Sequence, residues 1–213
     1  SCAKGESPLT AKDSLSLATD CSLLENKGAV VSFNSYEEVL YEWFYLRLGF
    51  YAKRIERERV ILRLRLLIAE NKVKYLQLLD NRKDLFGIDK SEFVEILQNH
   101  GLCRIREIPY ENNMRCNAIP NNQVITFATG EIPPEHELLF KDLIAHRVMA
   151  EKLSYKYLTD IPTGRIMRKG IDQLNAHIAE LRARLVEYDN PDIIKRTWLT
   201  ELSEFNKYLQ SKN

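Results

Sequence analysis

Residues 47–58, RLGFYAKRIERE, interleave apolar and charged side chains along the whole stretch. A buried strand does not tolerate that many charges, whereas a helix can place the charges on one side and the apolar residues on the other. The surrounding chain, from Tyr36 to about Asp80, has no proline and a single glycine, Gly49. We therefore predict one helix of about 45 residues, roughly 65 Å long, capped at its start by Asn34 or Ser35. Such a length favours an arm or a coiled coil.

The composition favours a mainly helical protein without a strong electrostatic bias. The 213 residues are 45% hydrophobic, include only eight glycines and carry a formal net charge of +1. This length can bury a substantial core, and the near-zero charge does not demand a nucleic-acid partner. No apolar run approaches the roughly 20 residues of a membrane span. We therefore expect no membrane partner. The four cysteines form no C-x-x-C pair, which favours reduced thiols and an intracellular location.

A second long helix is predicted near the end of the sequence. Apolar residues recur there at steps of three and four, which is the spacing of the seam between two supercoiled helices. We predict that this helix returns along the first one as an antiparallel coiled coil. The predicted seam comprises Leu48, Tyr51, Ile55, Ile171, Leu174, Ile178, Leu181 and Leu185.

These two helices divide the chain into four segments. Residues 1–35 contain two apolar runs separated by Asn26-Lys27-Gly28, which predicts a small β-hairpin at the end of a preceding domain. Residues 36–80 are the outgoing helix, and residues 81–169 are a globular tip. Residues 170–213 are the returning helix and a C-terminal helix.

Local patterns predict three elements within the tip. Residues 90–99, KSEFVEILQN, are typical of a short amphipathic helix that ends at Gly101. The segment QVITFAT, residues 123–129, is strand-like. Pro133 and Pro134 open a further helix that we expect to continue to about Tyr157. The expected fold class is mainly α: a long antiparallel coiled-coil arm with a helical globular tip and a small β-hairpin near the N-terminus.

Candidate catalytic and metal-binding residues are few. His100, Cys103 and Cys116 are spaced so that they could supply three zinc ligands, although ordinary packing is the favoured interpretation. Glu135 and Glu137 flank His136, but acidic residues are expected at a helix start in any case. The sequence has neither a G-x-x-x-x-G-K-[ST] phosphate loop nor a D-x-D pair. We assign no catalytic residue, no metal site and no cofactor to this chain.

The densest basic run lies in the first long helix. Glutamates dilute it, so a solvated helix face is favoured over a contact with DNA phosphates, which would carry no sequence information. The run comprises Arg54, Arg57, Arg59, Arg63 and Arg65.

Three motifs resemble type IIA DNA topoisomerases of the eukaryotic kind. That family carries an aromatic residue and R-L-x-x-Y-x-x-R near the start of its long helix, followed by L-x-N-K-x-x-F-[IL]. The matching residues here are Phe44, Arg47, Leu48, Tyr51, Arg54, Asn71, Lys72, Tyr75 and Leu76. YKYLTDIP is similar to the family's Y-x-Y-L-L-x-M-P segment at the lower dimer gate, and WLTELSEF to its W-x-x-D-L-x-x-F. These matches are Tyr155, Tyr157, Leu158, Ile161, Pro162, Trp198, Leu202 and Phe205.

The resemblance covers roughly residues 15–76 and 155–206, and the segment between them has no match. The family's Trp-Ser-Leu-Thr after the proline is replaced by residues 164–167 here, which affects the expected gate contacts. The short sequence after Phe205 lacks the long charged tail of cellular enzymes. This favours a viral enzyme, such as that of a large DNA virus like African swine fever virus.

The resemblance implies a part of an ATP-dependent enzyme that passes one DNA duplex through a transient break in another. The family's Mg²⁺-binding acids, ATPase site and nucleophilic tyrosine lie upstream of this region. That tyrosine follows an arginine, and none of the ten tyrosines here does. We therefore expect a lower dimer gate, the C-gate, that is inactive alone, with Mg²⁺, ATP and double-stranded DNA bound through the parent enzyme. The parent would act in the nucleus or, if viral, in the host cytoplasm.

The segment YLTDIPTGRIM is the expected homodimer contact. Its apolar residues persist although Pro162 and Gly164 prevent a regular helix, and such apolar patches mark interfaces when they are exposed. The predicted interface residues are Leu158, Ile161, Ile166 and Met167. Two rival interpretations remain open: a coiled-coil interaction protein without an enzyme parent, and a helical nucleic-acid-binding module.

Overall fold

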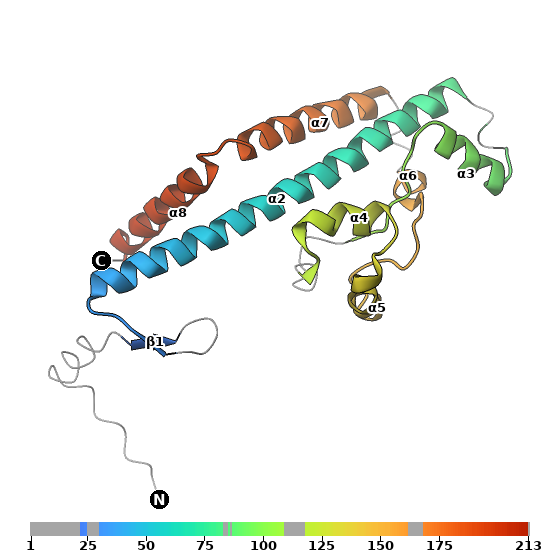
Figure 1. The fold of residues 1–213 in the computed structure, drawn as a ribbon. Coiled ribbons are helices and arrows are strands. Elements are labelled where there is room, and N and C mark those ends of the chain that lie inside the picture. The colour runs from blue at the N-terminus through green and yellow to red at the C-terminus, as the bar shows by residue number, and fades with distance from the viewer. Residues whose placement is uncertain are drawn as a thin grey trace, which may run out of the picture. The chain divides into compact units, whose positions relative to one another are not determined.

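The computed structural model describes residues 22–24, 30–82, 85, 87–108, 118–161 and 168–212. The described residues are mainly helical (Figure 1). The chain divides into two units, Ser1–Lys53 and Arg54–Asn213, and the longest helix, α2 (Tyr36–Asn81), contributes to both. Within these described ranges, no helix is both long and apolar enough to cross a membrane.

The first unit contains two short strands and the start of α2. Strands β1 (Ser22–Leu24) and β2 (Val30–Ser32) pair antiparallel, with Leu23 opposite Val31. The start of α2 is capped as predicted, because the hydroxyl oxygen of Ser35 accepts a hydrogen bond from the backbone N–H of Glu38 at 3.3 Å. The Glu38 carboxylate in turn accepts the backbone N–H of Asn34 at 2.8 Å. The predicted single helix is confirmed, with 46 residues.

In the second unit, α2 pairs with α7 (Arg168–Tyr188). The pair is antiparallel, since Arg182 bonds to Glu70 at 2.7 Å whereas Asp189, just beyond α7, bonds to Arg59 at 3.0 Å. Figure 1 shows the two helices side by side. Their shared apolar cluster is Leu62, Ala69, Val73, Ile178 and Leu181. Residues 189–192 end α7, and a further helix, α8 (Ile193–Gln210), follows them.

Short helices between α2 and α7 form the tip. Helix α3 (Lys90–Asn99) is confirmed, and Gly101 beyond it has φ 68°, a conformation that favours glycine. An isolated antiparallel bridge joins Ile105 to Ser154. The remaining elements are η3 (Asn121–Gln123), α4 (Val124–Thr129), η4 (Pro134–His136), α5 (Glu137–Ala145) and α6 (Lys156–Thr159).

Two predictions for the tip are wrong. QVITFAT is helical, because its buried side chains Val124, Phe127 and Ala128 lie at helical spacing rather than in alternation. The helix after Pro133 ends at Ala145 instead of continuing to about Tyr157. The N–H of Val148 donates to the carbonyl of Leu143 at 2.9 Å and closes the last turn.

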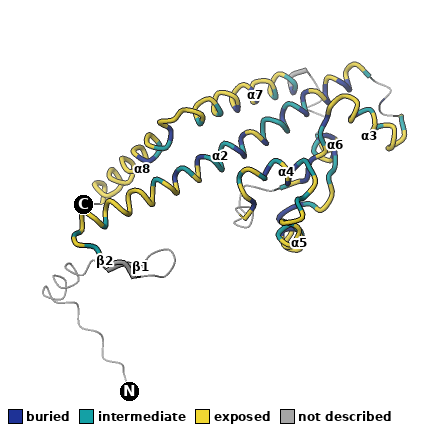
Figure 2. The backbone as a smooth tube through the Cα atoms, viewed as in Figure 1, coloured by how far each residue is buried: buried dark blue, intermediate teal, exposed yellow. Residues whose placement is uncertain are grey.

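Three buried clusters meet on α2. One cluster joins its end to α3 and α6, the second joins Val60 to α4 and α5, and the third is shared with α7. Successive residues of a helix are about 100° apart, so Val60 and Leu62 point to opposite sides. The buried stretches of α2 accordingly continue over several turns (Figure 2). Helix α2 therefore packs against α7 on one side and against the tip on another.

Candidate functional site

A chain of hydrogen bonds joins two of the three sequence motifs at the base of the tip. The side-chain amide of Asn71 on α2 donates to the hydroxyl oxygen of Tyr157 on α6 at 3.0 Å. The Tyr157 hydroxyl donates to the carbonyl of Cys103 at 2.7 Å. Beside it, the Tyr155 hydroxyl donates to the carbonyl of Leu102 at 3.0 Å. The predicted motif residues Asn71, Tyr155 and Tyr157 thus converge from α2 and the segment at the start of α6.

Burial keeps the phenols near this junction uncharged. Burial is the largest cause that raises the pKa of Tyr157 far above its ordinary value, and the Asn71 hydrogen bond only partly opposes it. Burial also raises the pKa of Tyr75 on α2, whose ring meets Phe93 of α3 edge to face at 6.4 Å. Both tyrosines therefore keep their hydroxyl protons over the physiological pH range. Tyr157 can then act as a hydrogen-bond donor, and neither side chain is suited to proton transfer.

Much of the basic run is not the solvated face that the sequence suggested. Arg59 donates to the carbonyl of Tyr188 at 2.7 Å and pairs with Asp189 at the end of α7. Arg57 donates to the carbonyl of Ile119 at 3.0 Å in the tip. Arg54 pairs with Glu201 of α8 at 2.8 Å. These arginines connect α2 to three other segments. Arg54 and Arg63 are exposed nevertheless, whereas Arg57, Arg59 and Arg65 are half-buried.

Arg106 is a structural residue that sequence analysis missed. Its side chain is buried, and its guanidinium donates to the carbonyls of Phe127 at 2.9 Å and Gly130 at 2.6 Å. A cation at these carbonyls suits the negative end of α4. Burial lowers the pKa of Arg106, whose guanidinium also lies over the ring of Phe140 at 5.1 Å. Its neighbour Ile105 is buried too, so no alternation in the sequence marks Arg106 as an inward-facing residue.

The predicted dimer contact needs a correction. Leu158 is fully buried against Leu97, Leu102 and Tyr155 in this chain's own core, so its side chain has no surface left for a second subunit. Ile161 is half-buried and packs against the same core, and its role in a dimer stays a prediction. The other predicted contact residues, Ile166 and Met167, lie outside the described residues, as does Pro162.

The predicted seam residues differ in burial. Tyr51, Ile55, Ile178 and Leu181 are buried, whereas Leu48, Ile171, Leu174 and Leu185 are half-buried. Sequence analysis missed the α2 side of the pair with α7. Successive steps of four, three and four residues in the sequence mark these positions: Leu62, Leu66, Ala69 and Val73.

The other motif residues lie apart from the junction. The Arg47 guanidinium lies 5.5 Å from the centre of the Tyr51 ring, a cation–π contact within one helix. Trp198 is buried, whereas Leu202 and Phe205 on the same helix are exposed. Lys72 is half-buried on α2 next to Asn71.

Two of the three candidate zinc ligands, and Glu137 beside His136, have other partners or lie outside the described residues. His100 donates from its ring Nδ1 to the carbonyl of Ile96 at 2.8 Å, and Cys116 lies outside the described residues. Glu137 pairs with Lys141 at 2.7 Å, and this hydrogen bond lowers the pKa of the carboxyl. Over the ranges that the structure describes, no three His, Cys, Asp or Glu side chains are placed to hold a metal ion.

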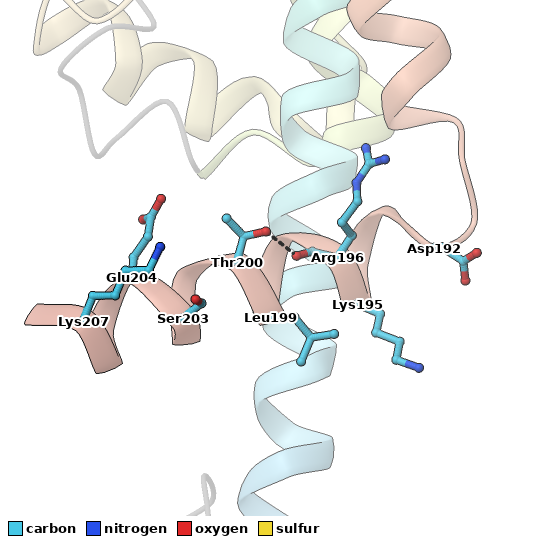
Figure 3. A pocket seen from close by; sticks show the side chains of 8 residues that line it. All are labelled: Asp192, Lys195, Arg196, Leu199, Thr200, Ser203, Glu204 and Lys207. Carbon is cyan, nitrogen blue, oxygen red and sulfur yellow. Dashed lines mark hydrogen bonds between the residues drawn. The ribbon is translucent and has the colours of Figure 1, made fainter. Parts of the chain in front are cut away.

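An open hollow of about 570 Å³ runs along α8 (Figure 3). Its lining consists of Asp192, directly before α8, and seven residues of α8 itself, and it includes both basic and acidic groups. Thr200 donates from its hydroxyl to the carbonyl of Arg196 at 2.9 Å. The hollow is therefore the polar face of a helix. Its lining residues are Asp192, Lys195, Arg196, Leu199, Thr200, Ser203, Glu204 and Lys207.

Comparison with known sequences agrees with the motifs. Over 85 residues, or 40% of this chain, the sequence is 34% identical to DNA topoisomerase 2 of the African swine fever virus isolates Tick/Malawi and Pig/Kenya. It is 33% identical over the same length to that of strain Badajoz. The matched stretch is only 7% of each relative, so the chain spans a small part of the curated relatives it matches. No family model matches the chain.

The fold has a counterpart among solved structures. The crystal structure of the Plasmodium falciparum topoisomerase II DNA-binding, cleavage and re-ligation domain is similar over 92% of this chain and 25% of that chain. The TM-score is 0.60 at 19% sequence identity, so this likeness concerns the fold alone. With the viral relatives, it confirms the resemblance to type IIA DNA topoisomerases that the three motifs predicted.

Proposed function

We propose that this chain is the lower gate, or C-gate, of an ATP-dependent type II DNA topoisomerase. In this role the α2–α7 pair is the coiled-coil arm, and the tip holds two subunits together. The tips part to release the transported DNA duplex and then close again. The parent enzyme is an isomerase that changes DNA topology, and this chain supplies its gate rather than its chemistry.

One observation carries the proposal. The tip is inserted between two antiparallel helices, and the two motifs that resemble the family's arm and gate meet there through Asn71 and Tyr157. A coiled-coil interaction protein without an enzyme parent would explain the helices. It would not explain 34% identity to a topoisomerase over 85 residues.

The proposal assigns ATP and Mg²⁺ to other parts of the parent enzyme. Among the described residues, no carboxylates converge as Mg²⁺ requires. No tyrosine in the sequence follows an arginine, as the family's nucleophile does. DNA is a partner through the parent, which would act in the nucleus or, for a viral parent, in the host cytoplasm.

The oligomeric state of the chain tests the gate role. We expect a homodimer by light scattering, and Ile161→Asp is expected to give a folded monomer because a symmetric contact repeats the buried carboxylate in both subunits. The matched control is Leu138→Asp, since Leu138 on α5 is 83% exposed and should tolerate the charge. A wild-type chain that stays monomeric at high concentration would contradict the gate role.

Circular dichroism distinguishes a substitution that disrupts the dimer interface from one that unfolds the chain. Leu181→Asp, at a buried position of the α2–α7 pair, is expected to unfold the chain. If Ile161→Asp also unfolds it, or leaves a folded dimer, the assignment of Ile161 to the interface is wrong.

DNA assays test the remaining part of the proposal. The chain alone is expected neither to cleave nor to relax supercoiled DNA with Mg²⁺ and ATP. It should bind duplex DNA weakly at a salt concentration of about 150 mM. Nanomolar binding there would favour the nucleic-acid-binding alternative instead.

A further inference from the structure

Asn71 is one of two polar or charged side chains that are buried among the described residues, the other being Arg106. It is 2% exposed, and it lies on α2 between two apolar clusters. Ala69 and Val73 belong to the cluster shared with α7, whereas Tyr75 and Leu76 belong to the core of the tip. The polar chain from Asn71 through Tyr157 to the Cys103 carbonyl therefore sits where α2 passes from one neighbour to the other.

The apolar contacts around this chain leave the placement of the tip underdetermined. The core of the tip meets α2 at Tyr75, Leu76, Leu78 and Leu79, and apolar burial has no direction. Such contacts tolerate a small shift or rotation of the tip against α2. The Asn71 amide, in contrast, meets the Tyr157 hydroxyl in one placement only, because a hydrogen bond requires a narrow range of distance and angle.

Three segments depend on that one placement. Asn71 belongs to α2, Tyr157 to α6, and Cys103 to the stretch between α3 and the Ile105–Ser154 bridge. Helix α6 ends at Thr159, two residues before Ile161. The hydrogen-bonded chain thus holds the last described element before residues 162–167.

We propose that Asn71 and Tyr157 are positioning residues that select a single placement of the tip on α2, and that they contribute little to the overall stability of the chain. Buried polar groups act in this way when they select one register among several apolar alternatives. The inference goes beyond the proposed gate function and does not depend on it, because it concerns how one chain folds.

The test combines unfolding midpoints with spin-label distances in the full chain, with its native cysteines replaced by serine. One label replaces Arg63 on α2 and the other Lys152 in the tip, both at exposed positions. A second pair, at Arg63 and Arg184, reports on the α2–α7 pair and serves as an internal control. The variants are Asn71→Leu, Tyr157→Phe and the double variant.

Each single variant leaves one buried partner without its hydrogen bond, so we expect a lower unfolding midpoint. The double variant removes both polar groups, and we expect its midpoint to return to within a few degrees of the wild type or above it. Its Arg63–Lys152 distance distribution should nevertheless broaden or split, while the Arg63–Arg184 distribution stays narrow.

Two results would overturn the inference. One is a double variant whose Arg63–Lys152 distribution remains as narrow as that of the wild type, because the apolar contacts and the Arg57–Ile119 hydrogen bond would then suffice to place the tip. The other is a double variant with a midpoint as low as that of the single variants, which would show that the hydrogen bonds contribute to the overall stability of the chain.

Discussion

The two parts of α2, residues 36–50 and 54–81, are both rich in apolar side chains but differ sharply in burial. In the first part most of the large apolar residues are 40–66% exposed, including Trp43 and Tyr45, whereas Leu48 is half-buried. In the second part, side chains such as Leu62, Leu64 and Leu76 are at most 2% exposed. One continuous helix thus presents two different surfaces.

This difference shows that burial along α2 depends on the neighbouring segments and not on the local sequence. The part after Arg54 is covered by α7 and by the tip, and each fully buried leucine there contributes about 2 kcal/mol. Of the two parts of α2, residues 54–81 therefore contribute most to the free energy of folding, whereas the exposed aromatic residues of the first part add little to it. The following predictions test that division.

The largest effect is expected from a matched pair of truncations in the two parts of α2. Leu62→Ala should lower the free energy of unfolding by about 2–5 kcal/mol, because it leaves a cavity between α2 and α7. Leu46→Ala, at a position that is 47% exposed, should change it by no more than about 0.5 kcal/mol. Urea denaturation measures both, and equal losses would remove the distinction between the two parts.

A smaller effect is expected where charges connect α2 to its neighbours. Arg59→Met should cost about 1 kcal/mol, because it leaves the Tyr188 carbonyl and Asp189 without their partner. Part of that cost should disappear in 1 M salt, where exposed ion pairs are screened. The matched control is Arg63→Met at an exposed position of the same helix. If both variants lose the same stability, the Arg59 contacts do not stabilise the pair.

A third prediction tests whether exposure alone implies tolerance. Gly101 is exposed and has open space around its Cα, yet Gly101→Ala should cost about 1 kcal/mol because φ is 68°. Arg147 adopts φ 54° at the equivalent position after α5, so Arg147→Gly should relieve backbone strain and raise the unfolding midpoint. Differential scanning calorimetry measures both changes, and a shift in the same direction for both would contradict the backbone argument.

The smallest effect concerns alkaline pH. Because burial raises the pKa of Tyr75 in the folded chain, the stability linked to its neutral form is fully present below the ordinary tyrosine pKa of about 10. It is lost as the pH rises above that value, because the unfolded chain then releases its proton first. Tyr75→Phe should therefore flatten the fall in unfolding midpoint above about pH 10. Identical slopes for variant and wild type would show that Tyr75 is not linked to folding.

The sequence was sufficient to predict the long helices. An uninterrupted run without proline predicted α2, and the returning helix and C-terminal helix predicted over residues 170–213 correspond to α7 and α8. Regular steps of three and four also identified Ile178 and Leu181, which the structure buries. These features are local, so a single sequence contains them.

The features that were missed depend on tertiary contacts. Val60 and Leu64 lie on the side of α2 away from Leu62. When apolar residues occur on two sides of a helix, the sequence does not show which side packs against the partner helix. Nothing in the sequence distinguishes Arg106 from a surface arginine, because the carbonyls to which it donates at the end of α4 are brought near it only by the fold. Leu158 was expected at an interface, but an apolar residue near a proline is equally compatible with the core of its own chain, where the structure places it.

The insertion of the tip between α2 and α7 has a consequence for synthesis on the ribosome. Glu70 on α2 and its partner Arg182 on α7 are separated by 112 residues. Helix α2 is therefore synthesised well before the helix that covers it. At the usual 5–20 residues per second, that wait lasts roughly 6–20 seconds. During this time, the leucines of α2 have no α7 to cover them. The tip, whose contacts are shorter in sequence, is able to fold first and to bring the two ends together, which lowers the entropic cost of closing so long a loop.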